Sequence, residues 1–166
     1  MSCCSGSPLG PLIIPTIGGA VAEASVATGT IPAGTANYQQ ITGGAFVATT
    51  PNARWTLTAA GGIWTYNAGF PAQQYAARFV MAGDPSAAVT WTSAVSYNGD
   101  LIGAAAGFTG GAMQEMSGGA ANIKNSVSER IVTVSPGDTV RGICAKTVAG
   151  VTITITRAYL VLVPVR

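Results

Sequence analysis

The sequence predicts an all-β protein, an antiparallel β-sandwich preceded by an extended arm rich in proline and glycine. Two observations support the sandwich. From about residue 45 onward apolar and polar residues alternate, which is the pattern of half-buried strands. Turn-forming residues separate these alternating runs. A third observation argues against helices: no segment keeps a helical period, and residues 20–27 allow one or two helical turns at most.

The arm is predicted to cover residues 1–36. Proline recurs in a Gly-, Ala-, Ser- and Thr-rich sequence, and proline is disfavoured in helix interiors and central strands. Because the segment is also apolar in its middle, we expect it to lie along another surface; a loosely packed terminus is the alternative. The candidate anchoring residues are Cys3, Cys4, Leu12, Ile13 and Ile14.

The sandwich is predicted over residues 37–166. Its alternating or extended runs are 55–59, 89–97, 131–134, 140–145 and 151–155. Turns are predicted at 98–100, 135–138 and 149–150. Residues 103–125 form a glycine-rich loop between strands, either an exposed tip or a segment packed on a neighbour.

The closing strand is apolar on both faces from Tyr159 to Val163. Such a strand belongs in the middle of a sheet, with a second layer on one side and a cover on the other. A partner subunit is one such cover. Arg157 and Arg78 lie within apolar strands, where each is expected to pair with a carboxylate or to extend its charged end to the rim of the sheet, and a subunit interface is a natural place for both.

The charge content favours a protein that is part of an assembly. Only 8 basic and 6 acidic residues are present, 8% of the chain, against roughly 25% in soluble domains. Partner chains would hide part of such a surface. The net charge of +2, without adjacent basic residues, argues against nucleic-acid binding. No apolar run of membrane-spanning length occurs, and the N-terminus lacks the pattern of a signal peptide.

The sequence also argues against an enzyme. Histidine is absent, which excludes the usual catalytic triad, and there is no phosphate-binding loop. Asp84, Asp100 and Asp138 are interpreted mainly as turn or loop residues, with a calcium site between loops as the alternative. No cofactor or metal is therefore expected.

The tryptophans and cysteines have structural interpretations. The tryptophans lie in strand-like runs and are predicted to be core residues, with a carbohydrate-binding platform as the alternative. They are Trp55, Trp64 and Trp91. Cys144 is expected in the core. Cys3 and Cys4 are either free thiols or form an intermolecular disulfide.

The second half of the chain resembles the jelly-roll domains of the tumour-necrosis-factor/C1q type. The matching stretches are 130–140, with the turn residues Gly137 and Asp138, and the closing run 158–163. Residues 62–66 also resemble the family's early Gly-x-Tyr strand. The resemblance implies a jelly roll and a homotrimer whose closing strand lies near the threefold axis, while an immunoglobulin-like strand order stays an alternative. The candidate interface residues are then Tyr159, Val161, Val163 and Arg157.

The composition is also similar to that of bacteriophage virion proteins. It is rich in Ala, Gly and Thr and free of histidine. Taken with the jelly-roll resemblance, this leads us to expect a trimeric capsid decoration or cementing protein on the virion surface. Such a protein would be made in the host cytoplasm and anchored by its arm to the major capsid protein or neighbouring virion proteins. The alternatives are a receptor- or glycan-binding fibre tip and a bacterial surface or spore-coat trimer.

Overall fold

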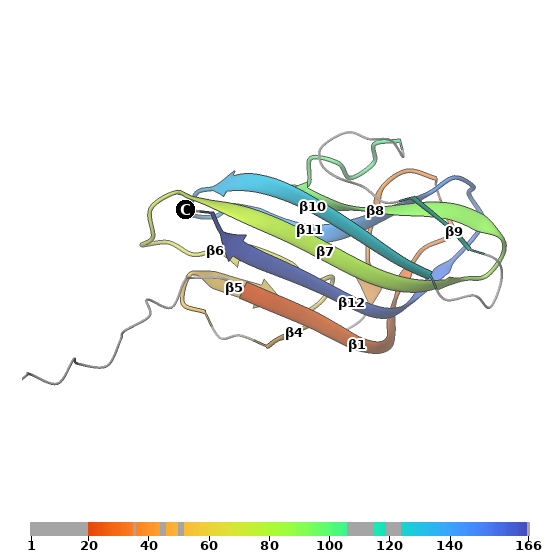
Figure 1. Cartoon of the computed structure of the whole chain (residues 1–166), viewed down its shortest axis with the longest axis horizontal. Helices are drawn as coiled ribbons and strands as arrows, with labels where there is room; N and C mark the ends of the chain where they lie inside the picture. The colour runs from red at the N-terminus through yellow and green to blue at the C-terminus, as the bar shows by residue number, and fades with distance from the viewer. Residues whose placement is uncertain are drawn as a thin grey trace, which may run out of the picture.

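The protein folds as two antiparallel β-sheets packed face to face (Figure 1). The computed structural model describes residues 20–34, 36–43, 46–49, 52–105, 115–118 and 124–165. Within these residues every regular element is a strand. The strands are β1 (Ala20–Ile31), β2 (Gln39–Gln40), β3 (Thr42–Gly43), β4 (Val47–Ala48), β5 (Trp55–Thr58), β6 (Ile63–Tyr66), β7 (Gln73–Pro85), β8 (Val89–Tyr97), β9 (Glu115–Gly118), β10 (Lys124–Val134), β11 (Thr139–Lys146) and β12 (Ile153–Pro164).

The strand order is that of a jelly roll. The front sheet has the order β10-β7-β12-β1-β3, with β4 also paired to β1. The back sheet has the order β5-β6-β11-β8-β9, with β2 paired to β11. Successive strands such as β10, β11 and β12 alternate between the sheets, and β1 and β12 are neighbours. The predicted antiparallel sandwich is therefore confirmed, and the immunoglobulin-like order is excluded.

The core between the sheets follows from strict alternation along the strands. In β7 the side chains of Tyr75, Phe79 and Met81 are fully buried, while Arg78 between them is exposed. Burial of one such large side chain contributes about 1.5–3 kcal/mol. A Cβ on Gly142 of β11 would lie 2.3 Å from the Phe79 ring. Glycine is thus required at this contact between the sheets, because the Phe79 ring occupies the space that a side chain on residue 142 would need.

A polar seam joins the two sheets along one side of the sandwich. Ser93 of β8 and Ser126 of β10 are both fully buried, and their hydroxyl oxygens lie 2.7 Å apart. The Ser93 hydroxyl also reaches the Ser128 hydroxyl at 3.4 Å. Because each buried hydroxyl finds a partner, these serines are accommodated at little cost.

The predicted strand positions and turns agree with the structure at the C-terminal half. Strand β12 lies between β7 and β1, in the middle of the front sheet as expected. The predicted turns contain Gly99, Gly137 and Gly150, with φ of 80°, 92° and 86°. This left-handed backbone favours glycine, which explains why the turn compositions could be recognised.

The N-terminal part differs from the expected arm. Residues 20–31 form β1, which pairs with β12 from Ala20↔Leu162 to Ile31↔Ile153. The helical turns considered for 20–27 are likewise replaced by strand. This strand is rich in Ala, Ser, Thr and Gly and carries no clear apolar alternation, so only its pairing with β12 reveals it. Residues 1–19, with Cys3, Cys4, Leu12, Ile13 and Ile14, lie outside the described residues.

The glycine-rich stretch 103–125 contains regular structure. Within it, Glu115–Gly118 form β9, which pairs with β8 at the edge of the back sheet. Residues 106–114 and 119–123 lie outside the described residues. The stretch is therefore a connection that includes a short strand rather than one continuous loop.

Candidate functional site

The outer face of the front sheet carries a partly exposed apolar surface. The pairing register aligns three rows across β10, β7 and β12. The rows are Val127–Val80–Tyr159, Glu129–Arg78–Val161 and Ile131–Ala76–Val163. Ile131 and Val163 are 61% and 50% exposed, and the other apolar members are partly buried. We call these nine residues the outer apolar face.

The candidate interface residues of the closing strand all reach this side of the sheet. Tyr159, Val161 and Val163 point outward because Ala158, Leu160 and Leu162 alternate with them and are buried in the core. Their role in a subunit interface stays a prediction. The alternation nevertheless explains the two-sided apolar pattern, since one side faces the core and the other forms the outer face.

Arg157 is brought to the same side by an irregularity in the pairing. The register between β12 and β7 shifts between Ile155 and Arg157, which is typical of a β-bulge. The Arg157 guanidinium then lies 5.2 Å from the centre of the Tyr159 ring, in the range of a cation–π contact. Arg157 therefore sits at the end of the outer apolar face.

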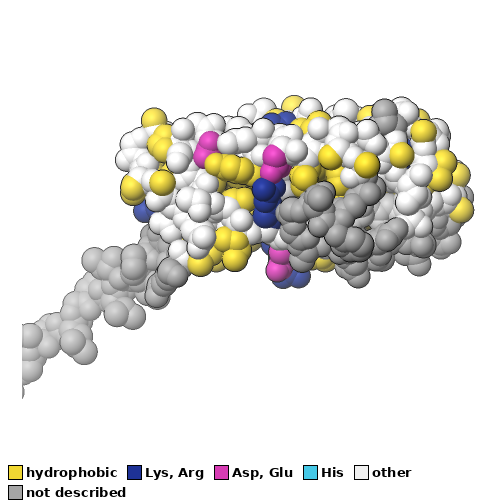
Figure 2. Space-filling view, turned by 90° about the horizontal axis from the view of Figure 1, so that it is seen from above, with side chains coloured by type: hydrophobic (Ala, Val, Ile, Leu, Met, Phe, Trp, Pro, Cys, Tyr) yellow, Lys and Arg dark blue, Asp and Glu magenta, His cyan; other side chains and the backbone are white. Residues whose placement is uncertain are grey.

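One ion pair interrupts this face. Arg78 Nε on β7 lies 3.2 Å from Glu129 Oε1 on β10, and the two residues are directly opposed in the register. Their side chains are 56% and 59% exposed. The expectation that Arg78 pairs with a carboxylate is confirmed. Figure 2 looks onto the side of the sandwich from above the view of Figure 1 and shows a few Lys or Arg and Asp or Glu side chains near the middle of that side, with apolar patches to either side.

The outer face of the back sheet, in contrast, is covered by the chain itself. Its apolar residues form a second small core with residues of the neighbouring loops; the members are Tyr38, Ala94, Leu101, Ile143 and Ala145. Two backbone hydrogen bonds hold the covering segments together, Tyr38 N–H to Ala104 O at 2.8 Å and Gly103 N–H to Tyr38 O at 2.9 Å. The middle of this face is thereby removed from solvent within one protomer, while Thr56 and Thr58 of β5, at its edge, stay exposed.

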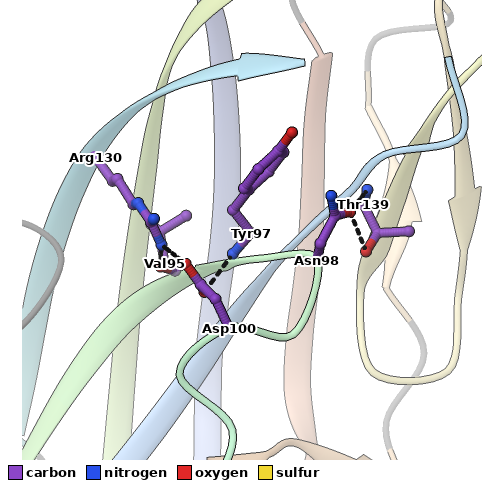
Figure 3. A network of polar contacts seen from close by, with 6 residues as sticks. All are labelled: Val95, Tyr97, Asn98, Asp100, Arg130 and Thr139. Atoms are coloured by element: carbon purple, nitrogen blue, oxygen red, sulfur yellow. Dashed lines mark hydrogen bonds and ion pairs between the residues drawn. The ribbon is translucent and has the colours of Figure 1, made fainter. Parts of the chain in front are cut away.

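A polar network holds the covering turn in place (Figure 3). Asp100 accepts the Tyr97 backbone N–H at 3.0 Å and pairs with Arg130 at 2.5 Å. Asn98, whose φ is 51°, accepts the Thr139 N–H at 2.7 Å. The turn after β8 is thus tied both to β10 and to the start of β11.

Asp138 is the second carboxylate of this network. It accepts hydrogen bonds from the Tyr97 hydroxyl at 2.6 Å, the Ser135 N–H at 2.7 Å and the Asn98 amide at 2.8 Å. Burial acts to raise the pKa of Asp138, but these three bonds outweigh it and hold the pKa below its ordinary value. The bond to Asp138, together with burial, raises the pKa of the Tyr97 hydroxyl.

These contacts argue against the calcium alternative. The oxygens of Asp100 and Asp138 are occupied by protein donors, and Asp84 lies within strand β7, where its backbone pairs with Thr154 of β12, rather than in a loop. Among the residues that the structure describes, no cluster of three His, Cys, Asp or Glu could hold a metal ion. In the same residues no helix is long and apolar enough to span a membrane.

The tryptophans are core residues, as expected. Trp55, Trp64 and Trp91 are 4%, 1% and 1% exposed. Trp55 also makes edge-to-face contacts with Tyr66 and Tyr75 at centroid distances of 5.0 and 5.1 Å. Because their faces are buried, these indoles cannot form the exposed carbohydrate-binding platform that the sequence left as an alternative.

Two buried residues with titratable side chains lie near the C-terminal end of β11. Cys144 is fully buried, which confirms its predicted place in the core, and burial raises the pKa of its thiol. Lys146 is also buried, its pKa is lowered by burial, and its Nζ donates to the Pro32 carbonyl. Lys146 therefore ties the segment after β1 to the back sheet, and nothing in the sequence had indicated this contact.

The sequence also missed part of the outer apolar face. Three of its residues were not predicted as interface candidates, because each is a single apolar residue in a half-buried strand. They are Val80, Val127 and Ile131. Only the register between β7 and β10 places them beside the closing strand. The available signal was Arg78, because a charged residue within the apolar run 75–82 marks the side of β7 that faces outward.

The strand order of the two sheets defines a jelly-roll β-sandwich. The structure is similar to Eiger TNF from S. frugiperda, with a TM-score of 0.52 and 16% identity over 88% of this chain and 92% of that chain. It is also similar to murine APRIL, with a TM-score of 0.51 and 11% identity over 89% and 99% of the two chains. No family model matches the sequence, and no curated protein does. At these identities the likeness establishes the fold alone.

Proposed function

We propose that this chain is a structural protein of a bacteriophage virion, a homotrimer that decorates or cements the capsid surface. The outer apolar face is the observation that carries the self-association. Exposed apolar surface of this kind marks interaction sites, and the low charge content points the same way. The proposal that three copies associate comes from the resemblance to the tumour-necrosis-factor/C1q type. The proposed interface contains Tyr159, Val161, Val163 and Arg157.

The capsid role rests on composition and on the segment that precedes β1. Strand β1 starts at Ala20, so residues 1–19 precede the sandwich and are the part proposed to reach neighbouring capsid proteins. This segment contains the apolar run Leu12-Ile13-Ile14 and the pair Cys3-Cys4, which would lock the contact through an intermolecular disulfide. In this proposal the protein is made in the host cytoplasm and has no enzymatic activity.

The oligomeric state is tested first, by light scattering of the purified protein over a range of concentrations. A trimer is expected, and a monomer at micromolar concentration would refute the assembly.

Capsid binding is tested with a deletion of residues 1–19, which leaves β1 intact. The deleted protein is expected to stay trimeric and to lose binding to undecorated capsids. A variant with Leu12, Ile13 and Ile14 changed to Ser keeps the length of the segment but removes its apolar side chains. It therefore shows whether capsid binding depends on these side chains or only on the length of the segment. A second variant, Cys3→Ser with Cys4→Ser, tests the disulfide on non-reducing gels. Unchanged capsid binding by the deletion variant would refute the anchoring role.

A further inference from the structure

The ion pair on the outer apolar face is surrounded by apolar side chains. Arg78 and Glu129 face one another on neighbouring strands, 3.2 Å apart. Along each strand the next residues on the same face are apolar, and so is the residue across from Arg78 on β12. These neighbours are Ala76, Val80, Val127, Ile131 and Val161. The pair is therefore a charged island in an apolar surface.

Protomer stability does not account for this placement. With side chains 56% and 59% exposed, the pair is solvated, and ion pairs of this kind contribute little to the stability of a protomer. Yet the chain has only 8 basic and 6 acidic residues, and it places two of them here.

The pair acquires an energetic role when a second copy covers the face. Apolar contact is non-directional, so flat rows of valine and alanine permit more than one alignment of the covering subunit. A guanidinium carries five N–H donors, and the contact with Glu129 is made by Nε. When water is excluded, each donor left without an acceptor weakens the assembly.

Building on the trimer proposed above, we propose that the Arg78–Glu129 pair fixes the orientation of the neighbouring subunit on the outer apolar face. The partner is a second copy of this chain that presents carboxylate or carbonyl oxygens to Arg78. Other alignments bury the guanidinium against apolar side chains and are rejected, which is specificity by exclusion.

The second ion pair on β10 does not act in this way. Arg130 Nη1 lies 2.5 Å from Asp100 and also donates to the Val95 carbonyl at 3.4 Å. Its side chain and that of Asp100 are only 22% and 34% exposed. This pair is therefore engaged within the protomer, where it is partly buried and anchors the turn after β8.

The test compares three variants by sedimentation velocity over a range of concentrations, with circular dichroism to verify folding. Arg78→Met with Glu129→Met removes the pair and keeps the surface apolar. Glu129→Gln is nearly isosteric and leaves Arg78 without its carboxylate. Arg54→Met, which removes a cation near Phe70 and away from this face, is the matched control.

The wild type and the Arg54→Met control are expected to form a single trimeric species. Glu129→Gln should raise the concentration of half-dissociation at least about tenfold, the equivalent of one hydrogen bond to a charged group. The double methionine variant should associate into a mixture of sizes. A double variant that forms the same single trimer, together with a Glu129→Gln change below about twofold, would overturn the role of the pair while leaving the trimer intact. A monomeric wild type would overturn both.

Discussion

The two outer faces of the sandwich carry similar kinds of residue but differ in whether other segments of the chain cover them. On the back sheet, Ala94, Ile143 and Ala145 are covered by Tyr38 and Leu101 from neighbouring segments. On the front sheet, Val161 and Val163 have no comparable cover among the described residues, and Val163 is 50% exposed. One face is thus completed within the protomer. The other is the surface for which we propose a partner.

This difference separates folding from assembly. Residues under the cover of the back sheet contribute to the free energy of unfolding of the protomer. In the proposed trimer, residues of the outer apolar face would contribute mainly to association, because the part of their surface that is exposed in the protomer would lose contact with water only when a second copy binds. Matched substitutions on the two faces are therefore expected to have different consequences.

The largest effect on the protomer is expected for Ile143→Ala. Ile143 is fully buried, so truncation leaves a cavity and lowers the free energy of unfolding by about 2–5 kcal/mol. Urea denaturation monitored by tryptophan fluorescence measures this loss. Val161→Ala, studied at concentrations below association, should cost less than about 1 kcal/mol. Equal losses for the two variants would contradict the distinction between the faces.

Val163→Asp is expected to abolish association without unfolding the protomer, and the row that contains Val163 holds no cation, since Val163 lies across from Ala76. The position of Val163 is half exposed in the protomer, so the carboxylate stays hydrated there. In an assembled trimer it would be buried without a partner, at a cost of about 3 kcal/mol, or roughly a hundredfold in affinity. Light scattering measures the loss, and circular dichroism should show an unchanged β-sheet signal. A trimer that persists in this variant would place the interface elsewhere.

Acid should loosen the cover of the back sheet through Asp138. Its pKa is lower in the folded protein than its ordinary value of 3.8. The stabilisation by its hydrogen bonds is therefore complete above that ordinary value and is lost as the pH falls through the lower, folded pKa. Asp138→Asn should cost about 1 kcal/mol at neutral pH, because the site is partly exposed. Unfolding curves from neutral pH down to about pH 2 should then be less pH-dependent than those of the wild type. An unchanged pH profile would refute this role of Asp138.

The smallest effect distinguishes two valines of similar exposure. Val163 on the outer apolar face and Val148 in the turn before β12 are 50% and 53% exposed. Val163→Thr buries a hydroxyl in the proposed interface and should weaken association about fivefold, equivalent to about 1 kcal/mol. Val148→Thr should leave the association constant unchanged. Sedimentation equilibrium compares the two, and equal effects would argue against a specific surface on the front sheet.

Much of the fold was predictable because the signal is local. Alternation in 89–97 and the turn residues Gly137 and Gly150 mark strands and reversals within a few positions of the chain. Strand β1 was missed, since its small residues become a strand through pairing with β12. The cover of the back sheet was missed for a similar reason, because Tyr38 and Ile143 are far apart in the sequence and meet only in the folded chain.

Part of the outer apolar face could be predicted from the sequence, namely the residues of the closing strand and Arg78. The unbroken apolar run of the closing strand indicates that both of its sides are apolar. From that run alone, Tyr159, Val161 and Val163 could be predicted as candidate interface residues. Arg78 was recognised as a cation in an apolar strand. Its partner Glu129 was not, because a cross-strand pair depends on the register, and the register is set by the packing of whole strands.

By itself, the sequence determined that the chain forms a β-sandwich, that it carries few charges, and that its last strand has two apolar sides. These properties follow from composition and local periodicity, because both depend only on the type of each side chain and on its nearest neighbours in the sequence. The tertiary structure alone decided which of the two outer faces is covered and which charges meet. Those outcomes depend on contacts between distant segments, since a side chain is buried only when another part of the chain, or another copy of it, occupies the space beside it.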